Sequence, residues 1–413
     1  MAIELLKEFF RDLKTHRMRS ALTLIAITWG TMSVVLLLAF GSGFGTAMRN
    51  GMVNAWNRVL IVYGGETGKV FEGLPKGRPI GLEERDVQLI KASVPNIVSI
   101  SPQYRKNAEL FFGKTRLTTE CEGAGPDFET MRAMYPEAGG RFIDANDIKY
   151  RKRSLFLGYE IAGDLFKGEN PIGKTVMLDN VPFTVVGIME KKLQTSMNNG
   201  PDSRRAVIPY STFRSIYGDE HINTMLIRGT SPAAQAQMIS DIRRVLGKKY
   251  RFDPTDERAV GIFDTMMIDE IIQKVTLGVN IFLGVVGLFT LMIAGVGVAN
   301  VMYVVVKERT REIGIKMAVG ARKSYILSQF VFEALFISLL GGTMGLLLSW
   351  GIVAATGLLD TSSGAMQFLG RPILSIWIML FTVTILTMIG LFAGVFPARK
   401  ASAVDPVESL RYE

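Results

Sequence analysis

One stretch of the sequence has the residue types and spacing of a phosphate-binding loop. Residues 168–175 read GENPIGKT and fit the pattern G-x-x-x-x-G-K-[ST]. That pattern binds phosphate when a strand leads in and a helix leads out, because backbone amides and the helix N-terminus then hold the anion. Here residues 159–166 have a helical pattern and residues 174–178 a strand pattern, and Pro171 lacks an amide hydrogen. We therefore interpret the motif as a connecting loop that binds no nucleotide.

Other residue types that commonly catalyse reactions are few and scattered. The two histidines, His16 and His221, are predicted on opposite sides of a membrane, so they cannot join in a metal site or a Ser-His-Asp triad. The acidic pair Asp269-Glu270 follows a helical pattern and fits a solvated face. Cys121 is the only cysteine, so we expect a buried thiol without a disulfide. The sequence predicts a chain that is not an enzyme by itself and holds no metal or cofactor.

Four long apolar segments indicate where much of the chain lies. They are residues 21–40, 275–306, 325–359 and 372–398, and Glu333 is the only formal charge within them. A helix of about 20 apolar residues crosses the roughly 30 Å hydrocarbon core of a bilayer. The first segment is longer than the roughly 7–15 apolar residues of a signal peptide, so we interpret it as a retained anchor. The sequence predicts an α-helical membrane protein with four transmembrane helices.

The net charge of +9 is concentrated beside these segments. Basic residues precede the first segment and fill the loop after the second: Lys7, Arg11, Lys14, Arg17, Arg19, Lys307, Arg309, Arg311, Lys316, Arg322 and Lys323. By the positive-inside rule, both regions are cytoplasmic. Residues 1–20 are then a cytoplasmic amphipathic helix, 307–324 a cytoplasmic loop or helix, 360–371 a short external loop and 399–413 a cytoplasmic tail. Residues 41–274 lie outside with nearly balanced charge, which argues against nucleic acid as a partner.

The external region is predicted to stand on a helical stalk. Residues 264–306 contain no proline and would form one helix about 64 Å long, roughly twice the hydrocarbon thickness. Residues 41–60 continue the first apolar segment with a loose helical stripe. We expect the outward ends of these two helices to carry the external domain.

That domain has a mixed α/β (α+β) pattern, with two subdomains as an option. We predict helices at 83–93 and 159–166, strands at 154–157, 206–209 and 224–228, and a hairpin of 174–178 with 181–188 around Asp179-Asn180. Ser211 is expected to cap a short helix. Ser231-Pro232 is expected to open another helix that Gly247 closes.

The cytoplasmic loop combines charged with small residues. A short helix there would present Glu312, Ile313 and Lys316 to a partner protein, and Gly320 and Ala321 would permit its close approach. Glu333 falls about two turns into the third span, where a carboxylate usually faces protein. We expect it to pair with a basic group of the loop or to hydrogen-bond to a helix; a proton relay is a further option. Gly341 and Gly345 form a small-xxx-small face for helix packing, within or between subunits.

These segments together resemble the MacB/FtsX-like ABC transporter permease family. The resemblance rests on ERTREIGIK (308–316), AVGA (318–321), QFVFEA (329–334), Gly341-Gly342, FPARKA (396–401), DPVESLR (405–411) and MRSALTL (18–24) for the permease module. LGYEIA (157–162), NPIGKT (170–175) and VPFTVVGI (181–188) resemble its periplasmic core domain. Met317 stands where the family often has a basic residue.

The resemblance implies a function and partners that composition does not show. It implies a dimer with a second permease copy or paralogue, in the inner (cytoplasmic) membrane, in contact with membrane lipids. A separate ABC ATPase subunit would bind ATP and Mg²⁺ and rest on Glu308, Arg309, Arg311, Glu312, Ile313, Lys316, Gly320 and Ala321. ATP-driven closure would move the periplasmic domain (mechanotransmission), with a periplasmic adaptor as a candidate partner.

Three functions fit this resemblance. The first is MacB-like export of amphiphilic drugs, peptides or lipids. The alternatives are LolC-like lipoprotein release and FtsX-like regulation of a cell-wall hydrolase. The large external domain favours the first two.

Overall fold

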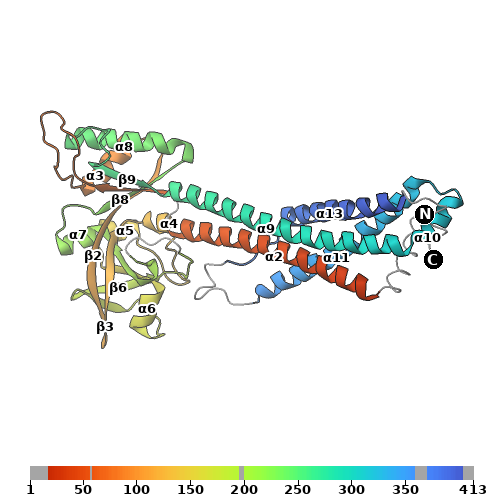
Figure 1. Cartoon of the computed structure of the whole chain (residues 1–413). Coiled ribbons are helices and arrows are strands. Elements are labelled where there is room, and N and C mark those ends of the chain that lie inside the picture. The colour runs from red at the N-terminus through yellow and green to blue at the C-terminus, as the bar shows by residue number, and fades with distance from the viewer. Residues whose placement is uncertain (1–16, 56–57, 195–199, 359–369, 403–413) are drawn as a thin grey trace. The chain divides into compact units, whose positions relative to one another are not determined.

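The computed structural model of the chain describes residues 17–55, 58–194, 200–358 and 370–402. The chain divides into two compact units (Figure 1). The helical unit comprises residues 1–47 and 273–413, and the core-domain unit comprises residues 48–272. Two long helices have residues in both units.

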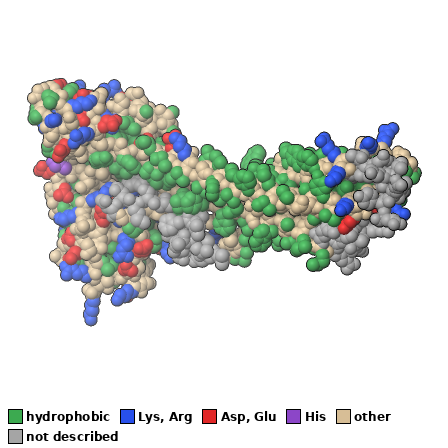
Figure 2. Space-filling view, viewed as in Figure 1, with side chains coloured by type: hydrophobic (Ala, Val, Ile, Leu, Met, Phe, Trp, Pro, Cys, Tyr) green, Lys and Arg blue, Asp and Glu red, His purple; other side chains and the backbone are tan. Residues whose placement is uncertain are grey.

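The helices that could cross a membrane are α2 (Arg17–Ala55), α9 (Thr265–Glu308), α11 (Lys323–Thr356) and α13 (Ile376–Ser402). Each contains a window apolar enough to span a bilayer, and no more than 33% of any window is buried within the structure. The remaining apolar surface therefore needs lipid or another chain to cover it. Hydrophobic side chains cover much of these helices in the space-filling view (Figure 2). The four predicted transmembrane helices are confirmed.

Small residues allow the helices of this unit to approach closely. A Cβ atom at Gly341 would lie 2.9 Å from the side chain of Ile27, and one at Gly345 would lie 2.7 Å from Thr31, so α11 packs directly on α2. The Thr28 hydroxyl also donates a hydrogen bond of 3.1 Å to the Gly341 carbonyl. The packing face predicted from Gly341 and Gly345 thus serves a contact within this chain.

Helix α9 extends unbroken over 44 residues, which confirms the long helix predicted over 264–306. Helix α2 has 39 residues and continues beyond residue 40, as its apolar stripe indicated. At 1.5 Å per residue the two helices are about 66 Å and 58 Å long. Both are therefore much longer than the roughly 30 Å that a hydrocarbon core requires.

The core-domain unit is built on nine hydrogen-bonded strands in the order β3-β7-β4-β6-β5-β2-β8-β1-β9. A further pairing of β3 with β2 closes six of them into a small barrel, and β8, β1 and β9 extend the sheet from β2. The strands are β1 (Val59–Gly64), β2 (Ile97–Phe112), β3 (Thr115–Ala124), β4 (Ser154–Leu157), β5 (Thr175–Leu178), β6 (Val181–Ile188), β7 (Arg205–Pro209), β8 (Thr224–Gly229) and β9 (Val260–Asp264).

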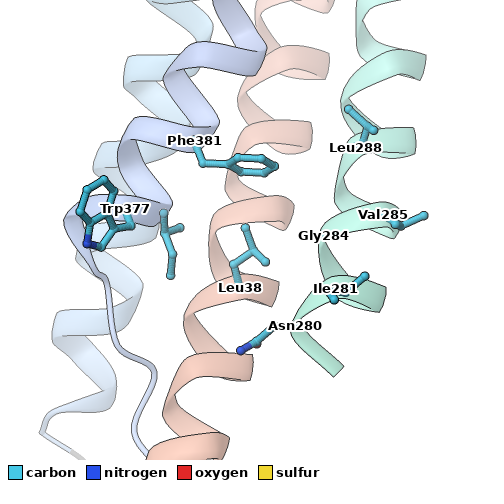
Figure 3. Close-up of a pocket in the computed structure, with 9 residues that line it drawn as sticks. Leu38, Asn280, Ile281, Gly284, Val285, Leu288, Trp377 and Phe381 are labelled. Carbon is cyan, nitrogen blue, oxygen red and sulfur yellow. The ribbon is translucent and has the colours of Figure 1, made fainter. Parts of the chain in front are cut away.

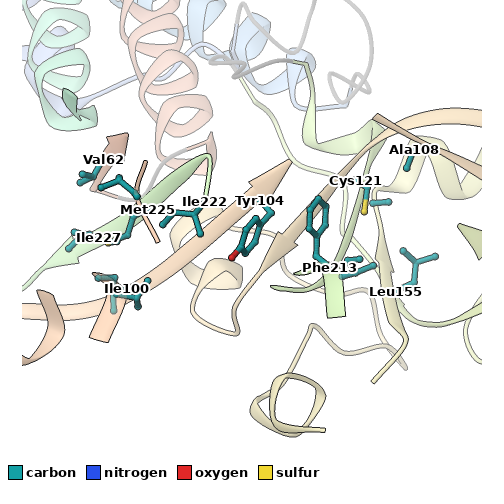
Figure 4. Close-up of a cluster of buried hydrophobic side chains, with 14 of the residues drawn as sticks. Val62, Ile100, Tyr104, Ala108, Cys121, Leu155, Phe213, Ile222, Met225 and Ile227 are labelled. Atoms are coloured by element: carbon teal, nitrogen blue, oxygen red, sulfur yellow. The ribbon is translucent and has the colours of Figure 1, made fainter. Parts of the chain in front are cut away.

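Short helices cover this sheet. They are α3 (Glu84–Ser93), α4 (Phe128–Arg132), α5 (Ala145–Lys149), α6 (Tyr159–Phe166), α7 (Tyr210–Tyr217) and α8 (Gln235–Tyr250). The main core includes Tyr104, Cys121, Leu155 and Phe213, all fully buried (Figure 4). Burial raises the pKa of the Cys121 thiol well above its ordinary value, as expected for a cysteine enclosed by apolar side chains.

The sheet is joined directly to α9. Strand β9 ends at Asp264 and α9 begins at Thr265, with no residue between them. The Thr265 hydroxyl donates to the Val59 carbonyl at 2.9 Å and accepts from the Val59 amide at 3.0 Å. The first turn of α9 is therefore hydrogen-bonded to the start of β1.

Several local predictions for this unit are confirmed, and two are wrong. The helices at 83–93 and 159–166 and the strand at 154–157 are present, and the predicted hairpin turns at Asp179 and Asn180, which both have positive φ. Ser211 does not cap α7, because Pro209 is the N-cap residue and the Ser211 hydroxyl donates to the Ile148 carbonyl. Gly247 does not end α8, which continues to Tyr250 and is capped by left-handed Arg251.

Candidate functional site

The P-loop-like segment lacks the structure that a nucleotide site requires. Helix α6 ends just before it at Phe166, and strand β5 begins at Thr175, so no helix N-terminus points into the loop. The Lys174 ammonium forms an ion pair with Glu169 of the same loop. The interpretation of residues 168–175 as a connecting loop is confirmed at the level of secondary structure.

The predicted cytoplasmic loop folds into a short helix, α10 (Thr310–Ala318), between α9 and α11. Arg309 interrupts the helical path after Glu308, and the Thr310 hydroxyl donates to the Lys307 carbonyl at 2.8 Å. The Gly320 amide donates to the Met317 carbonyl and the Ala321 amide donates to the Lys316 carbonyl, both at 3.0 Å. This is a Schellman ending, and Gly320 suits it because its φ of +99° is unfavourable for any residue with a side chain.

One face of α10 packs on the helical unit and the opposite face is exposed. Ile313 is 3% exposed and belongs to the apolar core of the unit. Ile315 is 47% exposed and Val319 is 84% exposed. The charged residues Arg311 and Glu312 are also exposed. We call Arg311, Glu312, Ile315 and Val319 the α10 outer face.

The prediction that Ile313 is presented to a partner is wrong, because this side chain fills the space between α10 and the long helices. Lys316 is half-buried, and its ammonium lies 3.4 Å from the Gln329 side-chain oxygen on α11. Of the three side chains predicted to face a partner, only Glu312 is exposed. Roles in ATPase coupling for Glu308, Arg309, Arg311, Glu312, Lys316, Gly320 and Ala321 stay predictions.

A polar cluster fixes the inner side of this connection. The Arg309 guanidinium lies 3.6 Å from the Glu333 carboxylate, and both side chains are more than four-fifths buried. Gln329 is one helical turn before Glu333 on α11, so Lys316 and Arg309 reach the same face of that helix. The cluster satisfies a carboxylate that would be costly in an apolar setting. Glu333 thus pairs with Arg309, a basic residue of the loop, as one of the two predicted arrangements required.

Sequence reasoning missed Ile315 and Val319. Helical spacing gives α10 two apolar pairs four residues apart, Ile313 with Met317 and Ile315 with Val319. Nothing in the sequence states which pair faces the long helices. A partner-binding surface was indicated by apolar residues in a charged loop, but the choice of face required the structure.

A second group of charged residues is buried in the core-domain unit. Asp202 is fully buried and forms ion pairs with Arg132 of α4 and with Lys192. The Lys192 ammonium lies 2.7 Å from the Asp202 carboxylate. Arg205 of β7 pairs with Glu122 of β3, and Gln103 of β2 donates to Glu122 at 3.0 Å. Burial alone would raise the pKa of Asp202, but the charges of Arg132, Lys192 and Arg205 outweigh it and lower this pKa to about 2.

This buried network has a structural explanation. It joins α4, three strands of the barrel (β2, β3 and β7) and the segment around Lys192. Buried ion pairs of this kind specify one arrangement of neighbouring segments. The described residues contain no group of three or more His, Cys, Asp or Glu side chains that could hold a metal.

Comparison with known families agrees with both units. Residues 20–245 match the family described as MacB-like periplasmic core domain, and residues 284–406 match the family described as FtsX-like permease C-terminal. The chain belongs to the MacB/FtsX-like permease family, a class of membrane proteins with a periplasmic core domain. The resemblance noted in the sequence is confirmed.

Curated relatives match almost the whole chain. The macrolide export ATP-binding/permease protein MacB of Chlorobium phaeobacteroides is 29% identical over 406 residues, which cover 98% of this chain and 60% of the relative. The protein of the same name from Shewanella sp. is 30% identical over 418 residues, which cover 100% of this chain and 61% of the relative. The chain therefore spans about three-fifths of these relatives, and the matched families identify that portion as the permease part.

A solved structure is also similar to part of the chain. The periplasmic region of MacB from Actinobacillus actinomycetemcomitans is 18% identical and covers 55% of this chain and 97% of that one, with a TM-score of 0.43.

Proposed function

We propose that the chain is the permease subunit of a MacB-like ABC transporter and that the α10 outer face binds an ABC ATPase subunit. The main support is that Ile315 and Val319 are exposed on a short helix flanked by charged residues. Apolar side chains surrounded by a polar rim are typical of protein-binding surfaces. The ATPase would bind ATP and Mg²⁺ and supply the hydrolysis.

The proposed mechanism uses α9 to transmit movement. This helix begins directly after β9 of the core domain and ends one residue before α10. In this proposal, a force applied to α10 would pass through α9, which is continuous from Thr265 to Glu308. Closure of two ATPases around ATP would move two permease chains, and each core domain would move with its α9. The second permease chain is a copy or a paralogue.

The proposed orientation places α10 and both termini in the cytoplasm, with the protein in the inner membrane. The basic residues around α10 support it through the positive-inside rule. Relatives at about 30% identity are named for macrolide export, which supports amphiphilic compounds as the exported class. A periplasmic adaptor is the proposed partner of the core domain.

Charge substitutions in α10 test the coupling role. Ile315→Asp and Val319→Asp place a carboxylate in the proposed interface, and we expect each to weaken co-purification with the ABC ATPase at least tenfold, since a buried unpaired charge costs about 3 kcal/mol or more. Ser215→Asp adds the same charge at an exposed site of α7 and is the matched control. Ile313→Asp is expected to lower the yield of folded protein instead, because Ile313 is buried. Normal ATPase association of both Asp variants would contradict the proposal.

Cysteine labelling tests the orientation independently. Cys121 is buried, so single cysteines introduced as Val319→Cys and Lys76→Cys are the sites expected to react in folded protein. We expect a membrane-impermeant maleimide to label position 76 in intact cells and position 319 only after the inner membrane is opened. Labelling of both positions from the same side would refute the topology.

A further inference from the structure

The helical unit contains an apolar cavity that the coupling mechanism does not use. Its volume is about 430 Å³, and it lies between α2, α9 and α13. Leu38 of α2, Leu288 of α9 and Phe381 of α13 are among the residues that line it. In Figure 3, Leu38 and Phe381 lie in the space between the three helices. The cavity is within the volume range of sites that bind one apolar ligand, which is roughly 300–1,000 Å³.

The mouth of this cavity is continuous with the surface that faces hydrocarbon. Ile281 is 58% exposed and Trp377 is 76% exposed, and both are lining residues. They lie on helices with the length and composition of membrane spans. The medium outside the cavity is therefore the acyl region of a bilayer, and an empty or water-filled cavity would be unfavourable there.

One polar residue interrupts the apolar lining. Asn280 of α9 points toward α2 in Figure 3, and its Oδ1 is buried against Gly41 without a hydrogen-bond partner among the described residues. The amide nitrogen has no hydrogen bond within the described part of the chain, so it is available to donate to an ester carbonyl.

We propose that this cavity binds one acyl chain of a membrane phospholipid, with the ester carbonyl of that chain hydrogen-bonded to the Asn280 amide. The bilayer is as apolar as the cavity, so transfer of methylene groups contributes little to affinity. Retention comes from close packing between three helices and from the hydrogen bond to Asn280. In the proposed orientation the lipid belongs to the outer leaflet, because Asn280 lies near the start of the apolar part of α9. This site does not depend on ATPase coupling.

A glycine in the cavity wall allows a clean test. A Cβ atom at Gly284, which lines the cavity, would meet no atom within 4 Å, so Gly284→Leu fills the cavity without a clash. Gly297 lies further along α9, does not line the cavity and is equally open, so Gly297→Leu is the matched control. Asn280→Leu keeps the side-chain size and removes the amide.

Native mass spectrometry of the full chain in mild detergent would count the phospholipids retained per chain. We expect wild type and Gly297→Leu to retain one phospholipid that Gly284→Leu loses. Asn280→Leu should release it about threefold to twentyfold faster, the range expected for one hydrogen bond inside a membrane. Equal retention in all variants, or no retained phospholipid in wild type, would overturn the proposal.

The same samples distinguish other occupants. Loss of the retained phospholipid on addition of an excess macrolide would assign the cavity to an export substrate and overturn the phospholipid proposal. A disulfide between two chains carrying Gly284→Cys would assign it to the contact between permease copies, with the same consequence. ATPase association of Gly284→Leu should be normal, so failure of this inference is separate from failure of the coupling role.

Discussion

The substitution Asp202→Asn tests whether the buried charges hold the core domain together. Asp202 is fully buried and pairs with Arg132 and Lys192, so an amide at this position leaves two cations without their counter-charge. Breaking a buried ion pair by removing one partner typically costs about 3–5 kcal/mol. We use the lower value, about 3 kcal/mol. At about 1.4 kcal/mol per factor of ten, this corresponds to roughly a hundredfold change in the opening equilibrium.

The pH dependence of the wild-type protein gives an independent magnitude. The pKa of Asp202 is about 2 in the folded chain, against about 3.9 in an unfolded one. A lowered carboxyl pKa contributes stability that is fully present above about pH 4 and is lost as the pH falls through about 2. At about 1.36 kcal/mol per pKa unit, the difference corresponds to about 2.6 kcal/mol. Asp202→Asn has no carboxyl group at this position to titrate. The free energy of unfolding of this variant should therefore lack the part of the decrease between about pH 4 and pH 2 that Asp202 causes in wild type.

Hydrogen exchange followed by mass spectrometry would measure both effects on the full chain. We expect the amides of β3 and β7 to exchange about a hundredfold faster in Asp202→Asn at neutral pH. Asp164→Asn is the control, because Asp164 pairs with Arg204 at 3.0 Å but both side chains are about half exposed. That pair should contribute less than about 1 kcal/mol. Exchange in Asp202→Asn that is unchanged, or no faster than in Asp164→Asn, would refute the assigned role of the network.

Three further predictions concern other parts of the chain. Gly345→Leu should lower the thermal stability of the detergent-solubilised protein, because a Cβ atom at this position would lie 2.7 Å from Thr31. Gly351→Leu is the control and should not lower it, because a Cβ atom there meets no atom within 4 Å. Equal melting temperatures of the two variants would contradict close packing of α11 on α2. Cys121 should resist maleimide at pH 8 until the protein is denatured, because burial raises its pKa, and a mass shift of the folded protein would disprove this. Lys174→Ala should leave ATP turnover by the assembled transporter unchanged, and loss of turnover would reopen the phosphate-loop interpretation.

The membrane-spanning helices were predictable because their signal is local. Each apolar segment satisfies the length requirement of a bilayer by itself, and the absence of proline between 264 and 306 was enough to predict α9. The hairpin at Asp179-Asn180 was predictable for the same reason, since two residues that tolerate positive φ specify the turn.

Features that depend on distant contacts were not predictable. The long hairpin of β2 and β3 was missed, because its alternating pattern includes charged residues such as Glu122, which is buried with an ion pair to Arg205 from another strand. The exposed face of α10 could not be predicted, because the pair Ile313 and Met317 and the pair Ile315 and Val319 have the same helical spacing. Ser211 was expected to cap a helix, but the Ile148 carbonyl from α5 competes for its hydroxyl. In each case the deciding partner lies far away in the sequence.

The junction of β9 with α9 restricts how the length of this helix can vary. Thr265 follows Asp264 directly and hydrogen-bonds to Val59, so the first turn of α9 is held to the start of β1. Each residue added to an α-helix turns everything beyond it by about 100°. One inserted residue would therefore turn Ile315 and Val319 by about 100° about the axis of α9, whereas seven would restore their direction to within about 20°. Natural length variation within this helix should accordingly favour insertions and deletions of about seven residues.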